Sequence, residues 1–137
     1  MKLSSEEREI IIKMQLEKSD RFMSEALAVS GLGMWDLVAN RLYYSVFHAV
    51  AGLFIKDGLE VKSHKGSVLM FGQKYVQTGF FDARWGRLYA KLQDLREKSD
   101  YNLVYVSTKD EMQPLLEETQ VLISTIKEYI ICQHQKN

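Results

Sequence analysis

The sequence predicts an all-α fold, an antiparallel bundle of four to five helices that forms one domain over residues 1–137. The chain contains one proline and eight glycines, which is too few for the many turns of a fold built from short strands. Hydrophobic residues make up 46% and charged residues 26%, as in ordinary globular proteins. No internal repeat, low-complexity tract or linker divides the chain, so a single helical domain is expected.

Two long helices are predicted in the N-terminal part of the chain. Ser4 and Glu7 have the spacing of a capping box, so the first helix should begin after Ser4 and run to about Ser30. The second helix should run from about Met34 to Lys56; because it is apolar around most of its circumference, it belongs at the centre of the bundle. The apolar stripe expected on the first helix consists of Ile10, Ile11, Met14, Phe22, Met23, Ala26 and Leu27.

The middle of the chain predicts two shorter helices. After a polar loop at 59–64, a short helix is expected over 65–76. The next helix should cover about 82–97, and the segment 98–106 is expected to be irregular or extended. The apolar residues of the 82–97 helix recur at spacings of three and four, and they are Trp85, Leu88, Tyr89, Leu92 and Leu95.

The last helix is predicted to start near Thr108, whose spacing to Glu111 again fits a capping box. Pro114 lies about one and a half turns further on, so either a kink or a later start is open at that position. The predicted helices and their short connections together give the antiparallel bundle.

Charge is balanced over the whole chain, with 18 basic and 18 acidic residues, so no global field attracts the protein to nucleic acid or to a membrane. The distribution is uneven, because residues 1–55 carry a net charge of −1, residues 56–98 carry +4 and residues 99–137 carry −3. A basic middle segment can mark a polyanion contact, but ordinary solvated surfaces show the same asymmetry, and both interpretations stay open.

Several sequence features bear on location and on cofactors. The single cysteine, Cys132, cannot form an intrachain disulfide, and the acidic N-terminal segment is unlike a signal peptide. No stretch of about 18 apolar residues is present, so we expect a soluble, cytoplasmic protein without a membrane partner. None of the three histidines follows a glutamate by three positions, and Cys-x-x-Cys and glycine-rich phosphate motifs are lacking. We therefore expect no metal site and no cofactor.

A polar stripe runs along the predicted second helix. Arg41 and His48 are seven positions apart, which places them on one helix face about 10.5 Å apart along the axis. Tyr44 and Ser45 fall between them, and Gly52 continues the line. A desolvated arginine must be paired, so this stripe needs either internal partners or an open cleft.

Two interpretations of the stripe follow. In the first, Arg41 pairs with a carboxylate of another helix and His48 is a core histidine whose hydrogen bonds are satisfied. In the second, both face a groove and act on a phosphodiester, since the arginine fork matches phosphate oxygens and histidine can transfer protons near neutral pH.

The same helix carries a resemblance to a known family. The segment 40–50, NRLYYSVFHAV, resembles the HEPN superfamily (higher eukaryotes and prokaryotes nucleotide-binding), in particular a bacterial subgroup whose helix reads approximately A-N-R-x-Y-Y-x-x-F-H. SHKG at 63–66, followed by Phe71 and the segment 75–79, resembles the T-H-x-G…F…Y-x-x-x-G stretch of that subgroup. REKSDY at 96–101 resembles its R-x-x-x-D-Y motif. Together the matches span roughly residues 20–130.

The resemblance implies a dimeric helical bundle, commonly encoded beside a minimal nucleotidyltransferase in toxin–antitoxin pairs. Many family members are metal-independent endoribonucleases that use the matching arginine and histidine, which here are Arg41 and His48. Ribonuclease members often have a polar residue directly after the arginine, whereas here Leu42 follows it and Asn40 precedes it. The implied function is an RNA-directed effector; the alternatives are a non-catalytic module that binds a nucleotide or a partner protein, and a purely structural dimer.

Further residues complete the predicted site. Tyr44 and Ser45 are expected to position a phosphate, and Asp100 to accept a hydrogen bond from Arg41 or Arg96. A homodimer is expected to place the two stripes opposite each other, with Gly52 allowing close approach. His64 is expected to cap a helix or lie on the surface. The candidate RNA- or nucleotide-binding residues are Arg41, Lys62, Lys65, Arg84, Arg87 and Lys91.

Overall fold

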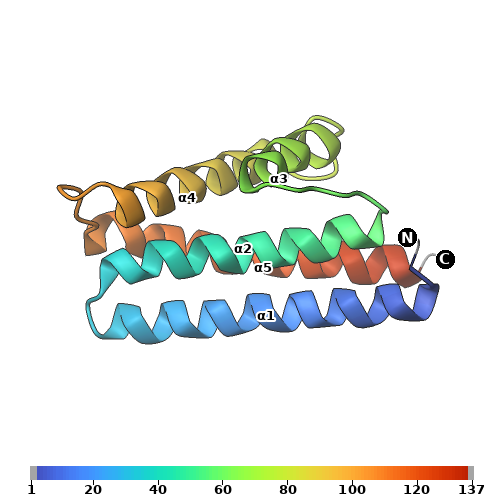
Figure 1. The fold of residues 1–137 in the computed structure, drawn as a ribbon, viewed down its shortest axis with the longest axis horizontal. Helices are drawn as coiled ribbons and strands as arrows, with labels where there is room; N and C mark the ends of the chain where they lie inside the picture. The colour runs from blue at the N-terminus through green and yellow to red at the C-terminus, as the bar shows by residue number, and fades with distance from the viewer. Residues whose placement is uncertain (1–2, 136–137) are drawn as a thin grey trace.

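The computed structural model describes residues 3–135, and the side chains of residues 3–132. Four long helices run alternately up and down (Figure 1). Along the chain, a short helix that ends in a π turn connects the second long helix to the third. The helices are α1 (Ser5–Gly31), α2 (Trp35–Lys56), α3 (His64–Phe71), α4 (Ala83–Tyr101) and α5 (Lys109–Gln135), with the π turn η1 at Gly72–Val76. The predicted all-α bundle is confirmed.

The predicted ends of α1 are close to those observed. The Ser4 amide donates to Glu7 Oε1 at 2.9 Å and the Glu7 amide donates to Ser4 Oγ at 3.1 Å, which completes the capping box. The predicted apolar stripe is partly wrong, because Ile10, Met14 and Leu27 are exposed. Because Ile10, Ile11 and Ile12 are consecutive, an apolar stripe can be drawn along more than one face of the helix. The face that packs inward carries Ile12, Leu16, Ser19, Met23 and Ala26.

Helix α2 lies at the centre, as its all-round apolar character predicts, and packs against α1, α4 and α5. Its buried residues come from most of its circumference. The chain leaves α2 through Gly58, whose φ of 71° is a backbone conformation that glycine adopts without strain. Within residues 3–135, no helix combines the length and the apolar character needed to cross a membrane.

The segment predicted as one helix over 65–76 is an α-helix that ends in a π turn. Ser63 caps α3 by accepting from the Gly66 amide at 2.9 Å, so the serine, not His64, is the cap. The Gln77 amide donates to the Gly72 carbonyl at 2.9 Å, which closes the π turn. In this turn Tyr75 is buried, and its hydroxyl donates to Asp57 at the end of α2.

Helix α4 is longer than predicted, because it continues through residues 98–101. Ion pairs at i,i+4 spacing join Asp94 to Lys98 and Arg96 to Asp100 along this extension. The irregular segment therefore covers residues 102–108, between the end of α4 and the start of α5.

Helix α5 begins at Lys109 and continues through Pro114, so a later start is excluded. The Glu111 amide donates to Thr108 Oγ1, but the Glu111 carboxylate accepts from the Tyr105 hydroxyl instead of closing the capping box. Pro114 has no backbone N–H, so one backbone hydrogen bond is missing near the start of α5.

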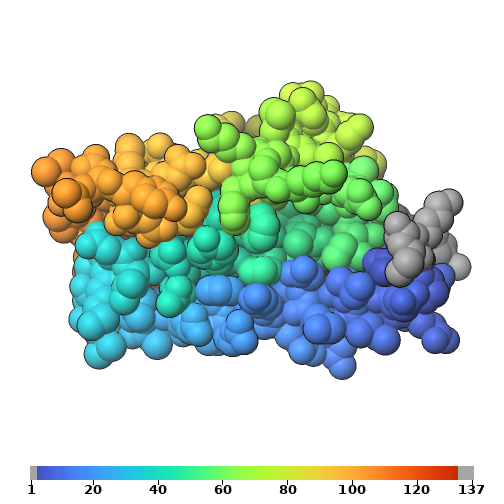
Figure 2. Space-filling view, in the orientation of Figure 1, coloured from blue at the N-terminus to red at the C-terminus, as the bar shows by residue number. Residues whose placement is uncertain are grey.

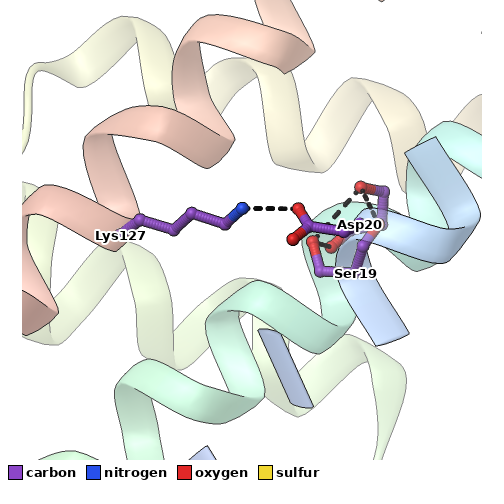
Figure 3. A network of polar contacts seen from close by, with 4 residues as sticks. Ser19, Asp20 and Lys127 are labelled. Carbon is purple, nitrogen blue, oxygen red and sulfur yellow. Dashed lines mark hydrogen bonds and ion pairs between the residues drawn. The ribbon is translucent and has the colours of Figure 1, made fainter. Parts of the chain in front are cut away.

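Polar contacts join α1 to both neighbouring helices. Figure 3 shows Lys127 of α5 reaching Asp20 of α1, and it shows the serine contacts beside this ion pair. Ser19 Oγ donates to the Ser45 carbonyl at 2.7 Å, and Ser45 Oγ donates to the Ser19 carbonyl at 2.9 Å. These reciprocal bonds fix the register between α1 and α2.

Gly52 faces α1 of the same chain. A Cβ at this position would lie 3.6 Å from Leu16 Cδ2 and 3.7 Å from the Ile12 carbonyl oxygen. The sequence interpretation, in which Gly52 lets two copies approach each other, is therefore wrong: its small size serves the α1–α2 contact.

This contact predicts opposite effects for two substitutions at one position. Gly52→Ala should raise the free energy of unfolding by about 0.5–1 kcal/mol, because the methyl group has room and alanine favours a helix. Gly52→Leu should lower it by about 1–3 kcal/mol, because the larger side chain pushes α1 away. Urea denaturation measures both, and equal stability of the two variants would contradict the packing.

Candidate functional site

One face of α2 is only partly covered by its neighbours. The partly exposed residues of this face recur at helical spacing, and we call them the α2 strip: Arg41, Tyr44, Phe47, His48, Ala51 and Ile55. Figure 2 shows α2 reaching the surface between α1 and the segment that leads into α3. The stripe predicted from the sequence is thus reachable from solvent along part of its length.

Arg41 is held by two neighbours. Its Nε lies 3.0 Å from Glu25 Oε1 of α1, and its Nη1 donates to Asn40 Oδ1 at 2.7 Å. The guanidinium carbon also lies 5.7 Å from the centroid of the Phe22 ring. The interpretation in which Arg41 pairs with a carboxylate of another helix is therefore confirmed, but a third of the side chain (34%) is exposed and can meet an anion.

His48 has a defined tautomer. Its Nδ1 lies 2.8 Å from Gln15 Oε1, and because an amide oxygen only accepts, Nδ1 carries the proton. The neutral ring therefore presents an unprotonated Nε2. The ring stacks on Phe22 with the centroids 5.5 Å apart and the planes 6° from parallel.

The surroundings of His48 favour its neutral form. Burial, helped by the nearby positive charges of Lys18 and Arg21 and by His64, lowers the pKa of His48 to about 4. Lys18 and Arg21 belong to α1, and neither was among the site residues predicted from the sequence. Positive charge therefore surrounds a histidine that is unprotonated at neutral pH, which is the form a general base requires.

His64 is not the cap of α3, which was one of its two predicted roles, and its ring is partly exposed beside α2. Its Nδ1 is 2.7 Å from the Tyr43 hydroxyl, and its ring centroid is 4.6 Å from that of Phe47. Burial raises the pKa of Tyr43 to about 12, so this hydroxyl stays protonated and donates. His64 Nδ1 then accepts, and Nε2 carries the proton. The two histidines thus present opposite groups, an acceptor at His48 and a donor at His64.

Arg96 is buried on the other side of the α2 strip. Its guanidinium carbon lies 5.0 Å from the ring centroid of Tyr43 and 5.8 Å from that of Tyr44. Asp100 pairs with this arginine at 3.7 Å and not with Arg41. Among the described residues, Arg96 Nε has no hydrogen-bond partner. A buried guanidinium with one long ion pair is incompletely neutralised, which favours an anion nearby.

The structure brings together only part of the predicted site. Ser45 is fully buried against Ser19, so the prediction that it positions a phosphate is wrong. Tyr44 is partly exposed and stacks on Phe22 with the ring centroids 5.5 Å apart, and its role in positioning a phosphate stays a prediction. Asn40 contacts Arg41, as described above.

Apart from Arg41, the basic residues predicted to bind RNA lie on two surfaces. Lys62 and Lys65 are exposed beside the start of α3, close to His64 in the chain. The other three share the exposed face of α4, away from the buried face that carries Arg96, and they are Arg84, Arg87 and Lys91. Arg84 also stacks over Trp85 at 4.0 Å, and the tryptophan belongs to the core, as expected.

The bundle and the site define a class of small helical proteins with an arginine and a histidine on a central helix. A family model described as HEPN domain matches residues 12–129, and the chain belongs to this family. It is 34% identical over 92 residues to the "Putative toxin MJ0605" of Methanocaldococcus jannaschii, which covers 67% of each chain.

Two further relatives extend the similarity over more of the chain. The "Putative toxin MJ0142" of the same organism is 23% identical over 116 residues, covering 85% of this chain and 79% of the relative. A "UPF0332 protein" of Archaeoglobus fulgidus is 22% identical over 116 residues, covering 85% of this chain and 92% of the relative. The similarity to these two relatives therefore extends over 85% of the chain.

The low pKa of His48 predicts how stability depends on pH. The unfolded chain takes up a proton at this position below about pH 6.5, whereas the folded protein does so only near pH 4. Between these values the unfolded state binds more protons, so stability falls as the pH falls. Thermal unfolding should show a smaller loss between pH 7 and pH 4.5 for His48→Gln than for the unaltered protein. Equal losses would show that His48 titrates normally.

Proposed function

We propose that this chain is an RNA-directed effector of the HEPN family that cleaves RNA without a metal, with His48 as its general base. The observation that carries the proposal is the geometry of His48. Gln15 holds the Nδ1 proton, so Nε2 is free to accept, and Lys18, Arg21 and Arg41 supply positive charge around the same part of the α2 strip. The names of the two toxin relatives support an effector role.

In the proposed reaction, His48 Nε2 removes the proton of a ribose 2′-hydroxyl. The 2′-oxygen then attacks the adjacent phosphorus, and the bond from phosphorus to the 5′-oxygen of the next nucleotide breaks. Water protonates that leaving oxygen, so the products are a 2′,3′-cyclic phosphate and a 5′-hydroxyl. A bound phosphate also raises the pKa of His48 toward neutrality, which makes it a stronger base in the complex than in the free protein.

Arginine side chains stabilise the charge that develops on the phosphoryl oxygens. Arg41 is reachable from solvent, and an incoming phosphate competes with Glu25 for its guanidinium. Arg96 is the second source of positive charge, because its Nε lacks a partner among the described residues. Tyr44 contacts Arg96 directly, and it shares the neighbour Phe22 with Arg41.

A partner-binding module is the second candidate function, and exposed apolar residues favour it. The connection between α4 and α5 is joined to the start of α2, since the Ser107 amide donates to Asp36 Oδ1 at 2.7 Å. Large apolar side chains are exposed at this end of the bundle, and they are Leu32, Met34, Leu37, Tyr101, Leu103, Val104 and Val106. The homodimer and the nucleotidyltransferase partner that the resemblance implies stay predictions, and this end offers a surface for either.

Cleavage of single-stranded RNA by the purified protein tests the first proposal. His48→Gln should lower the rate by about 10²–10⁴-fold, because it removes the general base. The product should carry a cyclic phosphate, and EDTA should leave the rate unchanged. Glu25→Gln is the matched control, because it frees Arg41 without touching His48 and should keep or raise activity. Full activity of His48→Gln would rule out the mechanism.

The salt dependence of RNA binding shows which basic residues contact the phosphates. Each phosphate contact with a single strand contributes about −0.7 to the slope of log K against log salt, so Lys18→Ala with Arg21→Ala should reduce the slope by about 1.4. The matched double variant, Arg87→Ala with Lys91→Ala on the exposed face of α4, should leave the slope unchanged. If the slope falls for the Arg87/Lys91 variant and not for the Lys18/Arg21 variant, the RNA binds on α4.

A further inference from the structure

A cavity beside the α2 strip has two chemically different sides. Its volume is about 460 Å³, which is within the usual range of small-molecule sites. Helix α2 forms an apolar wall from Phe47, Ala51, Phe54 and Ile55, to which Leu59 and Val61 add. The opposite edge comes from the loop before α3 and from its first turn, and it carries the polar side chains Glu60, Lys62, Ser63, His64 and Ser67.

This arrangement matches a flat heterocycle. The apolar wall and the Phe47 ring can contact the face of the ring, while polar atoms meet it along one edge. A lipid chain or an aliphatic side chain would use only the apolar wall and would form no hydrogen bond with the polar edge. The cavity adjoins the proposed catalytic histidine, because Phe47 contacts both His64 and His48, with centroids 4.6 Å and 5.3 Å apart.

The polar edge also discriminates among heterocycles. His64 presents an N–H at Nε2, because its Nδ1 accepts from Tyr43. Lys62 adds a second donor and Glu60 an acceptor, and neither forms an ion pair within the described part of the chain. Guanine has the complementary pattern, with acceptors at O6 and N7 and donors at N1 and N2. Adenine would place its amino group, which is a donor, opposite the donors of His64 and Lys62, where no hydrogen bond can form.

We propose that this cavity is a nucleobase pocket that prefers guanine, with Glu60, Lys62 and His64 reading the edge of the base. The inference rests on the proposed function insofar as the base belongs to an RNA substrate; a free guanine nucleotide would use the same contacts. In RNA, the pocket would hold a base next to the phosphate on which His48 acts, and it would set the sequence at which the strand is cut.

Calorimetric titration of the full chain with guanosine 5′-monophosphate tests the pocket. Binding should be at least about fivefold tighter than for the adenosine, cytidine and uridine monophosphates. Ala51→Leu fills the cavity from α2 and should abolish binding, whereas Ala28→Leu, the same change on the exposed face of α1, should not. Glu60→Gln should reduce the preference for guanine, and Glu128→Gln is its exposed control.

The outcomes separate the pocket from the ribonuclease proposal. Equal binding of the four nucleotides, or unchanged binding by Ala51→Leu and Glu60→Gln, would overturn the pocket even if RNA is cleaved. Guanine-selective binding that persists in His48→Gln, without RNA cleavage by the unaltered protein, would keep the pocket and remove the ribonuclease. If the circular dichroism spectrum shows that Ala51→Leu alters the fold, the result for Glu60→Gln alone tests the pocket. A tetranucleotide with one guanine that binds more tightly than the mononucleotide would identify RNA as the source of the base.

Discussion

The contact between α1 and α2 is the constraint on which the rest of this structure depends. A central helix with arginine, serine and histidine on one face cannot be buried unless another helix supplies partners for them. Helix α1 supplies a carboxylate from Glu25 to Arg41, a carbonyl and a hydroxyl from Ser19 to Ser45, and an amide from Gln15 to His48. Phe22 fills the space between these contacts and touches both Arg41 and His48. The register of the two helices is therefore set by polar groups as well as by apolar packing.

The same contact explains why the α2 strip can be both stable and reactive. Gln15 fixes the tautomer of His48 but leaves its second nitrogen free, and Glu25 neutralises Arg41 without covering it. On the opposite side, Tyr43 fixes His64 in the complementary tautomer, within a polar cluster where Ser67 and Tyr89 share a hydrogen bond of 2.7 Å. Core groups thus determine which atoms the two histidines present to the surface.

The sequence was sufficient for the fold, because local signals report directly on helices. The Ser4–Glu7 capping box and the all-round apolar character of residues 34–56 predicted α1 and the central position of α2. The partners in the site were not predictable in the same way: Gln15 lies 33 positions from His48, and His64 lies 21 from Tyr43. Helical periodicity shows which residues share a face of one helix, but it does not show which face of another helix lies opposite. Ile10, Met14 and Leu27 illustrate this limit, since their spacing fits a core and they are exposed.

The π turn at Gly72–Val76 places a constraint on chain length. Tyr75 is fixed in the core and bonded to Asp57, while His64, at the other end of the same segment, is bonded to Tyr43. The π turn contains one residue more than an α-helical turn would, so removing a single residue there would restore a regular helix. That deletion would rotate the first turn of α3 by about 100° relative to Tyr75 and draw it about 1.5 Å along the axis. The two anchors could then not be satisfied together, so the segment between them can vary in composition but not in the number of its residues.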